Sequence, residues 1–301
     1  MDMSLTVPRR SQSTYDLAAF RSNISSVSVT SRRAVVATST SSHHPGNVFI
    51  AGLSEPSGDV GSFPILDAPA PNHMLLGHSE TDLWTSSPNP PGGHDIVAIG
   101  GSEKAYMVGT EGSLLQTFNV GHDVRSIDWL SPTVAIGGTR KRPVYLWDAR
   151  TGGSSTRFYH SSGVTAIRSL GNGSQMVVCG FDGLALYDVR MPAKQTPNAS
   201  YKPSTAVLRM PFKTERPSVA MDICPDANLV AVGDDSNVIQ LRSLFSGKVV
   251  AELGKPDHSK EREYYTRLRF VEADDGKPTL MTCQGSKLLE WSWGGAEDDE
   301  A

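Results

Sequence analysis

The stretch GHDVRSIDWLSPTVAIGGTRKRPVYLWD, residues 121–148, contains three short apolar runs separated by polar turns that are rich in Gly, Pro and Ser. The runs cover residues 124–129, 133–138 and 144–147, and a fourth is expected near residues 155–159. Short apolar runs that are bounded by turn residues indicate β-strands. The stretch therefore predicts one unit of four antiparallel strands.

The same order of strands recurs along the chain. Three later units have first strands expected at residues 164–170, 218–224 and 266–271, and two earlier units begin near residues 26 and 83. First strands are spaced by roughly 40 to 58 residues, which is the period of four-stranded propeller blades. A single blade is too small to bury both of its faces, so blades must stack against one another. We therefore predict an all-β fold, a closed β-propeller with six or seven four-stranded blades.

The two ends of the chain differ in composition from the repeats. We predict a flexible N-terminal arm over residues 1–23, the propeller over 24–295 and an acidic tail over 296–301. The last unit lacks a fourth strand, and we expect the segment Met3–Val7 to supply it and latch the ring. The polar segments 192–217 and 254–263 are expected to be solvated insertions.

Composition excludes several classes of protein. The net charge of −4 argues against broad nucleic-acid binding, which requires an excess of Lys and Arg. No apolar run approaches the roughly 20 residues of a membrane span, and no secretory signal is recognisable. The three cysteines lie far apart in apolar runs, which indicates reduced thiols and no metal site. We expect a soluble protein of the nucleus, the cytoplasm or both, monomeric within a larger complex, without metal or cofactor.

Gly121-His122, followed about 25 residues later by Trp147-Asp148, resembles the WD-repeat family. The resemblance implies that His122, a strand Ser or Thr and Trp147 form a buried hydrogen-bonded network that stabilises one blade. In the next unit His160 and Tyr187 occupy the corresponding places, so its network is expected to be degenerate. His122, Trp147 and Tyr187 are therefore predicted to be structural residues.

Two successive units end their third strand with an Asp-x-Arg motif, Asp148-Ala149-Arg150 and Asp188-Val189-Arg190. Residues 135–150 resemble the box shared by WD-repeat substrate receptors of cullin-4 ubiquitin ligases, and the order of the blades over 164–293 resembles the factor-four type of these receptors. The resemblance implies docking on the ligase adaptor subunit through Asp148, Arg150, Asp188 and Arg190. Lys141 replaces the usual acidic residue of the box and Tyr145 its usual basic residue. The second box keeps its acidic residue, Asp182, but is one residue shorter and has Tyr in place of Trp.

The order of strands places the two arginines on one face. Arg150 and Arg190 both follow a third strand, so they project from the same side of adjacent blades and can bind carboxylates of a partner. The alternative is that each arginine pairs with the Asp two residues before it and only stiffens the turn. The basic loop with Arg140, Lys141 and Arg142 precedes the third strand, on the opposite face, and is the candidate surface for an unidentified protein client.

Three other functions compete with that of a substrate receptor. The first is a general WD-repeat scaffold in another multiprotein complex. The second is a propeller hydrolase that uses the central channel, for which no set of carboxylates or nucleophile–His pair stands out. The third is a nucleic-acid-binding protein, which the net charge disfavours. We therefore predict no catalytic residues.

Overall fold

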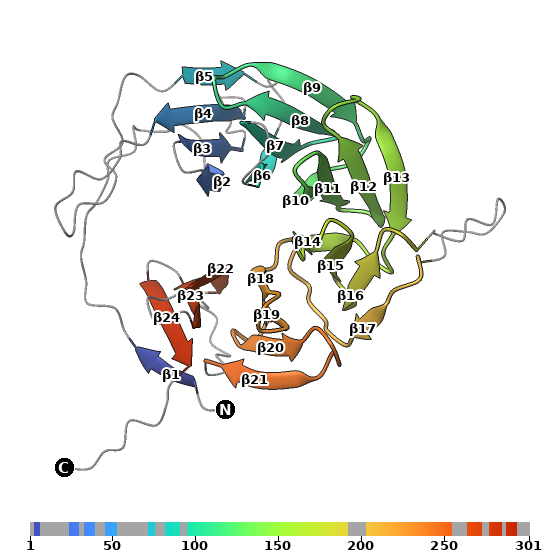
Figure 1. The fold of residues 1–301 in the computed structure, drawn as a ribbon. Coiled ribbons are helices and arrows are strands. Elements are labelled where there is room, and N and C mark those ends of the chain that lie inside the picture. The colour runs from blue at the N-terminus through green and yellow to red at the C-terminus, as the bar shows by residue number, and fades with distance from the viewer. Residues whose placement is uncertain are drawn as a thin grey trace, which may run out of the picture.

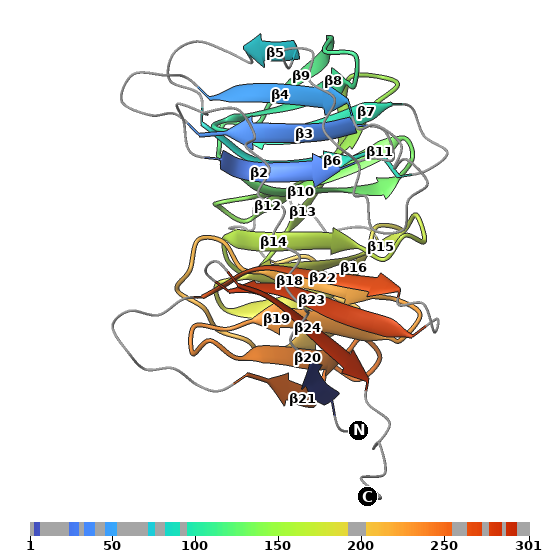
Figure 2. The ribbon, with the colours of Figure 1, turned by 90° about the vertical axis from the view of Figure 1, so that its left-hand side faces the viewer.

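The computed structural model describes residues 3–6, 24–29, 33–39, 46–52, 72–75, 82–90, 95–191, 203–254, 264–272, 277–284 and 287–293. Its strands form six antiparallel sheets of four strands each, and each sheet is one blade. Figure 1 shows the blades arranged around a central axis, and Figure 2 shows the same arrangement from the side. Six is the lower of the two predicted blade numbers.

The first three blades follow one another along the chain. Blade 1 consists of β2 (Ile24–Val29), β3 (Arg33–Thr38), β4 (Asn47–Gly52) and β5 (Asn72–Leu75). Blade 2 consists of β6 (Leu83–Pro88), β7 (Ile96–Gly101), β8 (Lys104–Gly109) and β9 (Leu114–Asn119). Blade 3 consists of β10 (Val124–Ser131), β11 (Val134–Thr139), β12 (Pro143–Asp148) and β13 (Ser154–Tyr159).

The second half of the chain forms the other three. Blade 4 consists of β14 (Val164–Ser169), β15 (Gln175–Gly180), β16 (Gly183–Asp188) and β17 (Leu208–Met210). Blade 5 consists of β18 (Met221–Cys224), β19 (Leu229–Gly233), β20 (Ile239–Ser243) and β21 (Val249–Leu253). Blade 6 consists of β22 (Tyr265–Glu272), β23 (Pro278–Gln284), β24 (Lys287–Trp293) and β1 (Met3–Thr6).

The fourth strand of blade 6 comes from the other end of the chain. Strand β1 pairs antiparallel with β24, with Met3 opposite Trp293 and Thr6 opposite Glu290. The expectation that a segment within Met3–Val7 supplies this strand is confirmed. These residues were placed in the predicted flexible arm 1–23, so residues 3–6 of that arm form a strand instead. The rest of the arm and the acidic tail 296–301 lie outside the described residues.

Blades that follow one another along the chain stack through buried apolar clusters, one at each of the interfaces 1–2, 2–3, 3–4, 4–5 and 5–6. The interface of blades 2 and 3, for example, contains Met107, Phe118, Trp129 and Trp147, all at most 5% exposed. Trp147 stacks on Tyr145 and Phe118, with ring centroids 5.9 and 5.6 Å apart. The Trp147 ring lies where a Cβ on Gly137 would be, so β11 requires Gly at that position. This packing fixes the third strand that leads into the first Asp-x-Arg motif.

Three outer strands differ from the sequence prediction. Strand β17 lies within segment 192–217, which was predicted to be a solvated insertion, and pairs with β16 through Leu208 and Met210. Strands β5 of blade 1 and β9 of blade 2 were not predicted. All three are outermost strands that pair on one side only, and β5 and β17 have only three or four residues, so their apolar pattern is too short to recognise. The insertion 254–263 lies, apart from Gly254, outside the described residues.

Among the described residues there is no helix with the length and hydrophobicity that a membrane crossing requires.

Candidate protein-interaction face

The first Asp-x-Arg motif forms a tight turn between β12 and β13. Asp148 ends β12, and its Oδ1 accepts hydrogen bonds from the Arg150 backbone N–H at 2.8 Å and from Arg150 Nε at 3.0 Å. Arg150 Nη2 donates to Asp148 Oδ2 at 2.8 Å. The carboxylate therefore caps the turn and also forms a bidentate ion pair with the guanidinium, in which each carboxylate oxygen accepts one hydrogen bond. The Arg150 side chain is 63% exposed.

The second motif repeats this geometry in the next blade. Asp188 Oδ1 accepts from the Arg190 backbone N–H and from Arg190 Nε, both at 2.9 Å. Arg190 Nη2 lies 2.5 Å from Asp188 Oδ2, and the Arg190 side chain is 73% exposed. Asp148 faces Val134 and Asp188 faces Gln175, each at the start of the second strand of its blade. The two arginines therefore occupy equivalent positions on the same face of adjacent blades, as predicted.

The two carboxylates remain charged over a wide pH range. The hydrogen bonds from the Arg150 side chain and backbone lower the pKa of Asp148 to about 2. The side-chain hydrogen bonds from Arg190, opposed by burial, lower the pKa of Asp188 to about 2. Both pairs are consequently ionised at any pH near neutrality.

The internal pairs leave part of each guanidinium free for another molecule. A guanidinium carries five N–H donors, and each carboxylate accepts two of those hydrogen bonds. The remaining donors of Arg150 and Arg190 lie on side chains that are well exposed. The Asp–Arg pairing within each turn, one of the two roles considered for these arginines, is therefore present, and the same contacts fix the orientation of each arginine side chain.

The predicted client loop lies at the other end of the third strand of blade 3. Arg140, Lys141 and Arg142 are exposed and directly precede β12, whereas Arg150 follows it. Arg140 Nη1 lies 4.0 Å from Asp123 Oδ2, and the Lys141 carbonyl accepts from the Val164 N–H of blade 4 at 3.2 Å. The basic loop and the two arginines therefore lie on opposite faces, as the order of strands predicted.

Blade 3 and blade 4 differ in how their structural residues interact. Trp147 is 1% exposed and is held by ring stacking, while His122 is half-buried. Among the described residues, no hydrogen bond joins His122 to Trp147. Tyr145, which replaces the basic residue of the box, is buried against Trp147 and its hydroxyl lies 3.4 Å from the Val120 carbonyl. The position that departs from the box therefore contributes to packing.

In blade 4 a buried histidine network is present. His160 Nδ1 lies 3.0 Å from the Tyr187 hydroxyl, and His160 Nε2 lies 3.3 Å from the Gly183 carbonyl. A carbonyl can only accept, so Nε2 donates to Gly183 and Nδ1 accepts from the tyrosine. Burial lowers the pKa of His160 to about 4, which keeps the ring neutral. The pair that was expected to be degenerate is thus the intact one, with Tyr in place of Trp.

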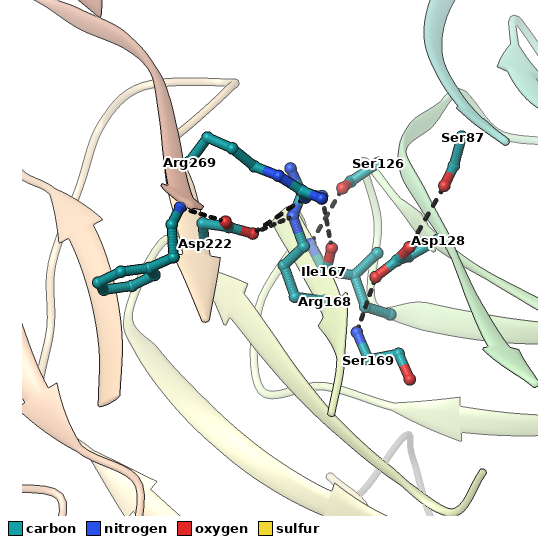
Figure 3. A network of polar contacts seen from close by, with 9 residues as sticks. Ser87, Ser126, Asp128, Ile167, Arg168, Ser169, Asp222 and Arg269 are labelled. Atoms are coloured by element: carbon teal, nitrogen blue, oxygen red, sulfur yellow. Dashed lines mark hydrogen bonds and ion pairs between the residues drawn. The ribbon is translucent and has the colours of Figure 1, made fainter. Parts of the chain in front are cut away.

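The innermost strands of the six blades line a central channel of 1190 Å³. The network in Figure 3 crosses its wall from blade to blade. Asp128 of blade 3 accepts from the Ser169 N–H of blade 4 at 2.8 Å and from Ser87 Oγ of blade 2 at 3.3 Å. Asp222 of blade 5 accepts from the Phe270 N–H of blade 6 at 2.9 Å. Each carboxylate therefore satisfies an edge N–H that the neighbouring inner strand cannot pair itself.

Asp222 also holds two arginines together. Arg168 Nε lies 3.3 Å and Arg269 Nη1 3.8 Å from its Oδ1 (Figure 3). Burial raises the pKa of Asp222 above its ordinary value, and the two arginines oppose that shift. Both channel carboxylates are thus engaged between blades and do not form an open acid–base pair. This network was not predicted from the sequence, because its members belong to different repeats and only the register of the inner strands brings them together.

Comparisons with known proteins bear on the fold of this chain. No protein-family model matches the chain. WD repeat-containing protein 21 of Schizosaccharomyces pombe is 31% identical over 138 residues, which are 42% of this chain and 33% of that relative. The findings support a WD-repeat propeller. The match spans about a third of the relative, so it bears on the repeats and leaves the function of the whole protein open.

Solved structures agree with this propeller fold. A chain of the mitotic checkpoint complex superposes with a TM-score of 0.64 and 18% identity, over 90% of this chain and 76% of that one. The computationally designed Ika8 protein superposes with a TM-score of 0.58 and 13% identity, over 90% and 71% of the two chains. At these identities the likeness concerns the propeller fold alone.

Proposed function

We propose that this WD-repeat propeller is the substrate receptor of a cullin-4 type ubiquitin ligase and docks on the adaptor subunit through Arg150 and Arg190. The observation that carries the proposal is the repetition of one rigid, exposed Asp–Arg turn at the same place in blades 3 and 4. Two arginines held in register by their own aspartates form a fixed pair of donors for carboxylates or backbone carbonyls. A generic scaffold needs no such repetition.

The remaining assignments follow from the two faces. The basic loop with Arg140, Lys141 and Arg142 faces away from the docking arginines, so a client bound there leaves the adaptor site open. The receptor performs no chemistry itself, and holding a client lysine near the conjugating enzyme supplies the rate enhancement by proximity. Its place is the nucleus, the cytoplasm or both, as a monomer within the ligase.

A pull-down with purified cullin-4 adaptor tests the proposal. We expect wild type to retain the adaptor and the Arg150→Ala/Arg190→Ala variant to lose it. The matched control is Arg140→Ala/Arg142→Ala, which removes the same number of guanidinium groups from the opposite face and should bind as wild type does. Circular dichroism and melting temperature confirm that all three proteins are folded.

A second pair of variants separates docking from turn stiffening. Arg150→Lys/Arg190→Lys keeps both positive charges but cannot make the two-point contact, so its binding should fall well below that of wild type. If the arginines only stiffen the turns, the alanine variant will lose thermal stability and bind the adaptor as before. Failure of folded wild type to bind would leave a general WD-repeat scaffold as the function.

A further inference from the structure

Blade 5 presents an aromatic residue at the place where blades 3 and 4 present arginine. Ser243 ends β20 opposite Leu229, as Asp148 and Asp188 end the third strands of their blades. Ser243 Oγ accepts the Phe245 N–H at 3.2 Å, which is the same capping contact that Asp148 and Asp188 make with the arginine two residues later. Position for position, Phe245 therefore corresponds to Arg150 and Arg190.

The Phe245 side chain is unusually exposed for its type. It is 89% exposed, whereas the next most exposed large hydrophobic side chain among the described residues, Leu288, is 52% exposed. Single exposed apolar residues are common on proteins, so exposure alone does not mark a site. The aromatic ring matters here because it shares a face and a turn position with two exposed guanidinium groups.

The turn that carries Phe245 is held rigidly. Gly247 N–H donates to the Ser243 carbonyl at 2.8 Å, and the Gly247 carbonyl accepts from buried Arg242 Nη1 at 3.2 Å. Ser243 Oγ also accepts the Ser246 N–H at 3.2 Å. A side chain on a fixed turn loses little conformational freedom when it is bound, which favours its use as an anchor.

The three turns follow one another around one face: those of blades 3 and 5 each contact the outer strand of the preceding blade, and Val189 of the blade 4 turn packs on the apolar cluster shared by blades 3 and 4. The blade 5 turn packs on blade 4, where a Cβ on Gly247 would lie 3.0 Å from Met210 Cγ. The blade 3 turn is tied to blade 2 by a 2.8 Å hydrogen bond from Gln116 Nε2 to the Ala149 carbonyl. Met191, which directly follows Arg190, is 47% exposed and adds apolar surface to the blade 4 turn, where its N–H donates to the Asp188 carbonyl at 3.0 Å.

We propose that Arg150, Arg190 and Phe245 form one docking row across three blades, in which Phe245 inserts into an apolar pocket of the same partner whose carboxylates face the arginines. The inference rests on the proposed function and adds a requirement to it: the partner surface must be acidic opposite blades 3 and 4 and apolar opposite blade 5. Interfaces of standard size span about 20 to 30 residues on each side, which accommodates a row of this extent. Arginine and large aromatic side chains are also the residues that dominate binding energy at interface centres.

The test is calorimetric or surface-plasmon titration of the full chain with purified cullin-4 adaptor. We expect Phe245→Ala to weaken binding about tenfold to thirtyfold and Phe245→Trp to retain it. The matched control is Leu288→Ala, which removes an exposed apolar side chain from blade 6 and should bind as wild type does. The melting temperature should change little in all three, because Phe245 is 89% and Leu288 52% exposed.

The outcomes separate this inference from the proposed function. If Phe245→Ala binds as wild type does while Arg150→Ala/Arg190→Ala does not bind, the row stops at blade 4 and the inference is overturned, whereas the receptor function stands. If wild type itself does not bind the adaptor, both are overturned. If Phe245→Ala and Leu288→Ala weaken binding equally, Phe245 has no specific role and the inference is again rejected.

Discussion

Acidification should destabilise the propeller through His160. The ring is buried and neutral, with a pKa of about 4 in the folded protein against an ordinary value of 6.5. Because the folded pKa is the lower one, the unfolded chain takes up the proton first. Stability is fully present above pH 6.5, falls as the pH drops from there, and stops falling near pH 4. At about pH 5, roughly 1.5 units below the unfolded pKa, the loss from this residue is about 2 kcal/mol.

Urea unfolding at about pH 7.5 and about pH 5, followed by tryptophan fluorescence, measures this loss. The aspartates of the two docking turns titrate near pH 2, so they do not contribute between these conditions. His160→Gln cannot titrate and serves as the control. We expect the free energy of unfolding of wild type to fall by about 2 kcal/mol more than that of the variant. An equal fall in the two proteins would refute the burial argument for His160.

Three further predictions concern packing and electrostatics. Gly137→Ala should lower the free energy of unfolding by about 1–3 kcal/mol, because the new Cβ would overlap the Trp147 ring. Gly153→Ala, in an open turn, is the control and should leave the free energy of unfolding unchanged. Equal melting temperatures for the two variants would contradict this prediction. Asp222→Ala should lower the free energy of unfolding, measured with urea, by about 2–3 kcal/mol, because Arg168 and the Phe270 N–H lose their buried acceptor. A change below about 0.5 kcal/mol would show that the network is dispensable for stability. The carboxyl carbons of Asp148 and Asp188 should titrate by NMR with midpoints near 2, and midpoints near the ordinary 3.8 would mean that the Arg pairs do not persist in solution.

The two middle strands of most blades could be predicted most readily from the sequence, because they are buried on both faces. Runs such as residues 134–138 and 175–180 are almost wholly apolar, and both ends are marked by turn residues. The outermost strands are half-exposed and can be very short. Strand β17 consists of three residues inside a polar segment, so its pairing with β16 depends on tertiary context that the local pattern does not contain.

The docking face could be predicted only in part. Asp148-Ala149-Arg150 and Asp188-Val189-Arg190 are local motifs, so their common face follows from strand order alone. Phe245 was not recognised, since blade 5 lacks the Asp and reads Leu241-Arg242-Ser243 at the end of its third strand. The structure supplies the missing relation, because the Ser243 hydroxyl caps the turn as the aspartates do. The contacts of Asp128 and Asp222 could not be predicted from local motifs either, because they join residues of different blades that are about 40 to 50 positions apart in the sequence.

The most direct test of the docking face is amide hydrogen–deuterium exchange of the full chain with and without purified cullin-4 adaptor. The amides of Arg150 and Arg190 belong to exposed residues and donate to side-chain carboxylates within short turns, outside the strand ladders, so they should exchange quickly in the free protein. We predict that the adaptor slows exchange in the turns around residues 148–152 and 188–191, and in the turn around 243–247 if the docking row extends to blade 5, while exchange in the loop 139–142 is unchanged. Protection of residues 139–142 with no change at the two Asp-x-Arg turns would contradict the account.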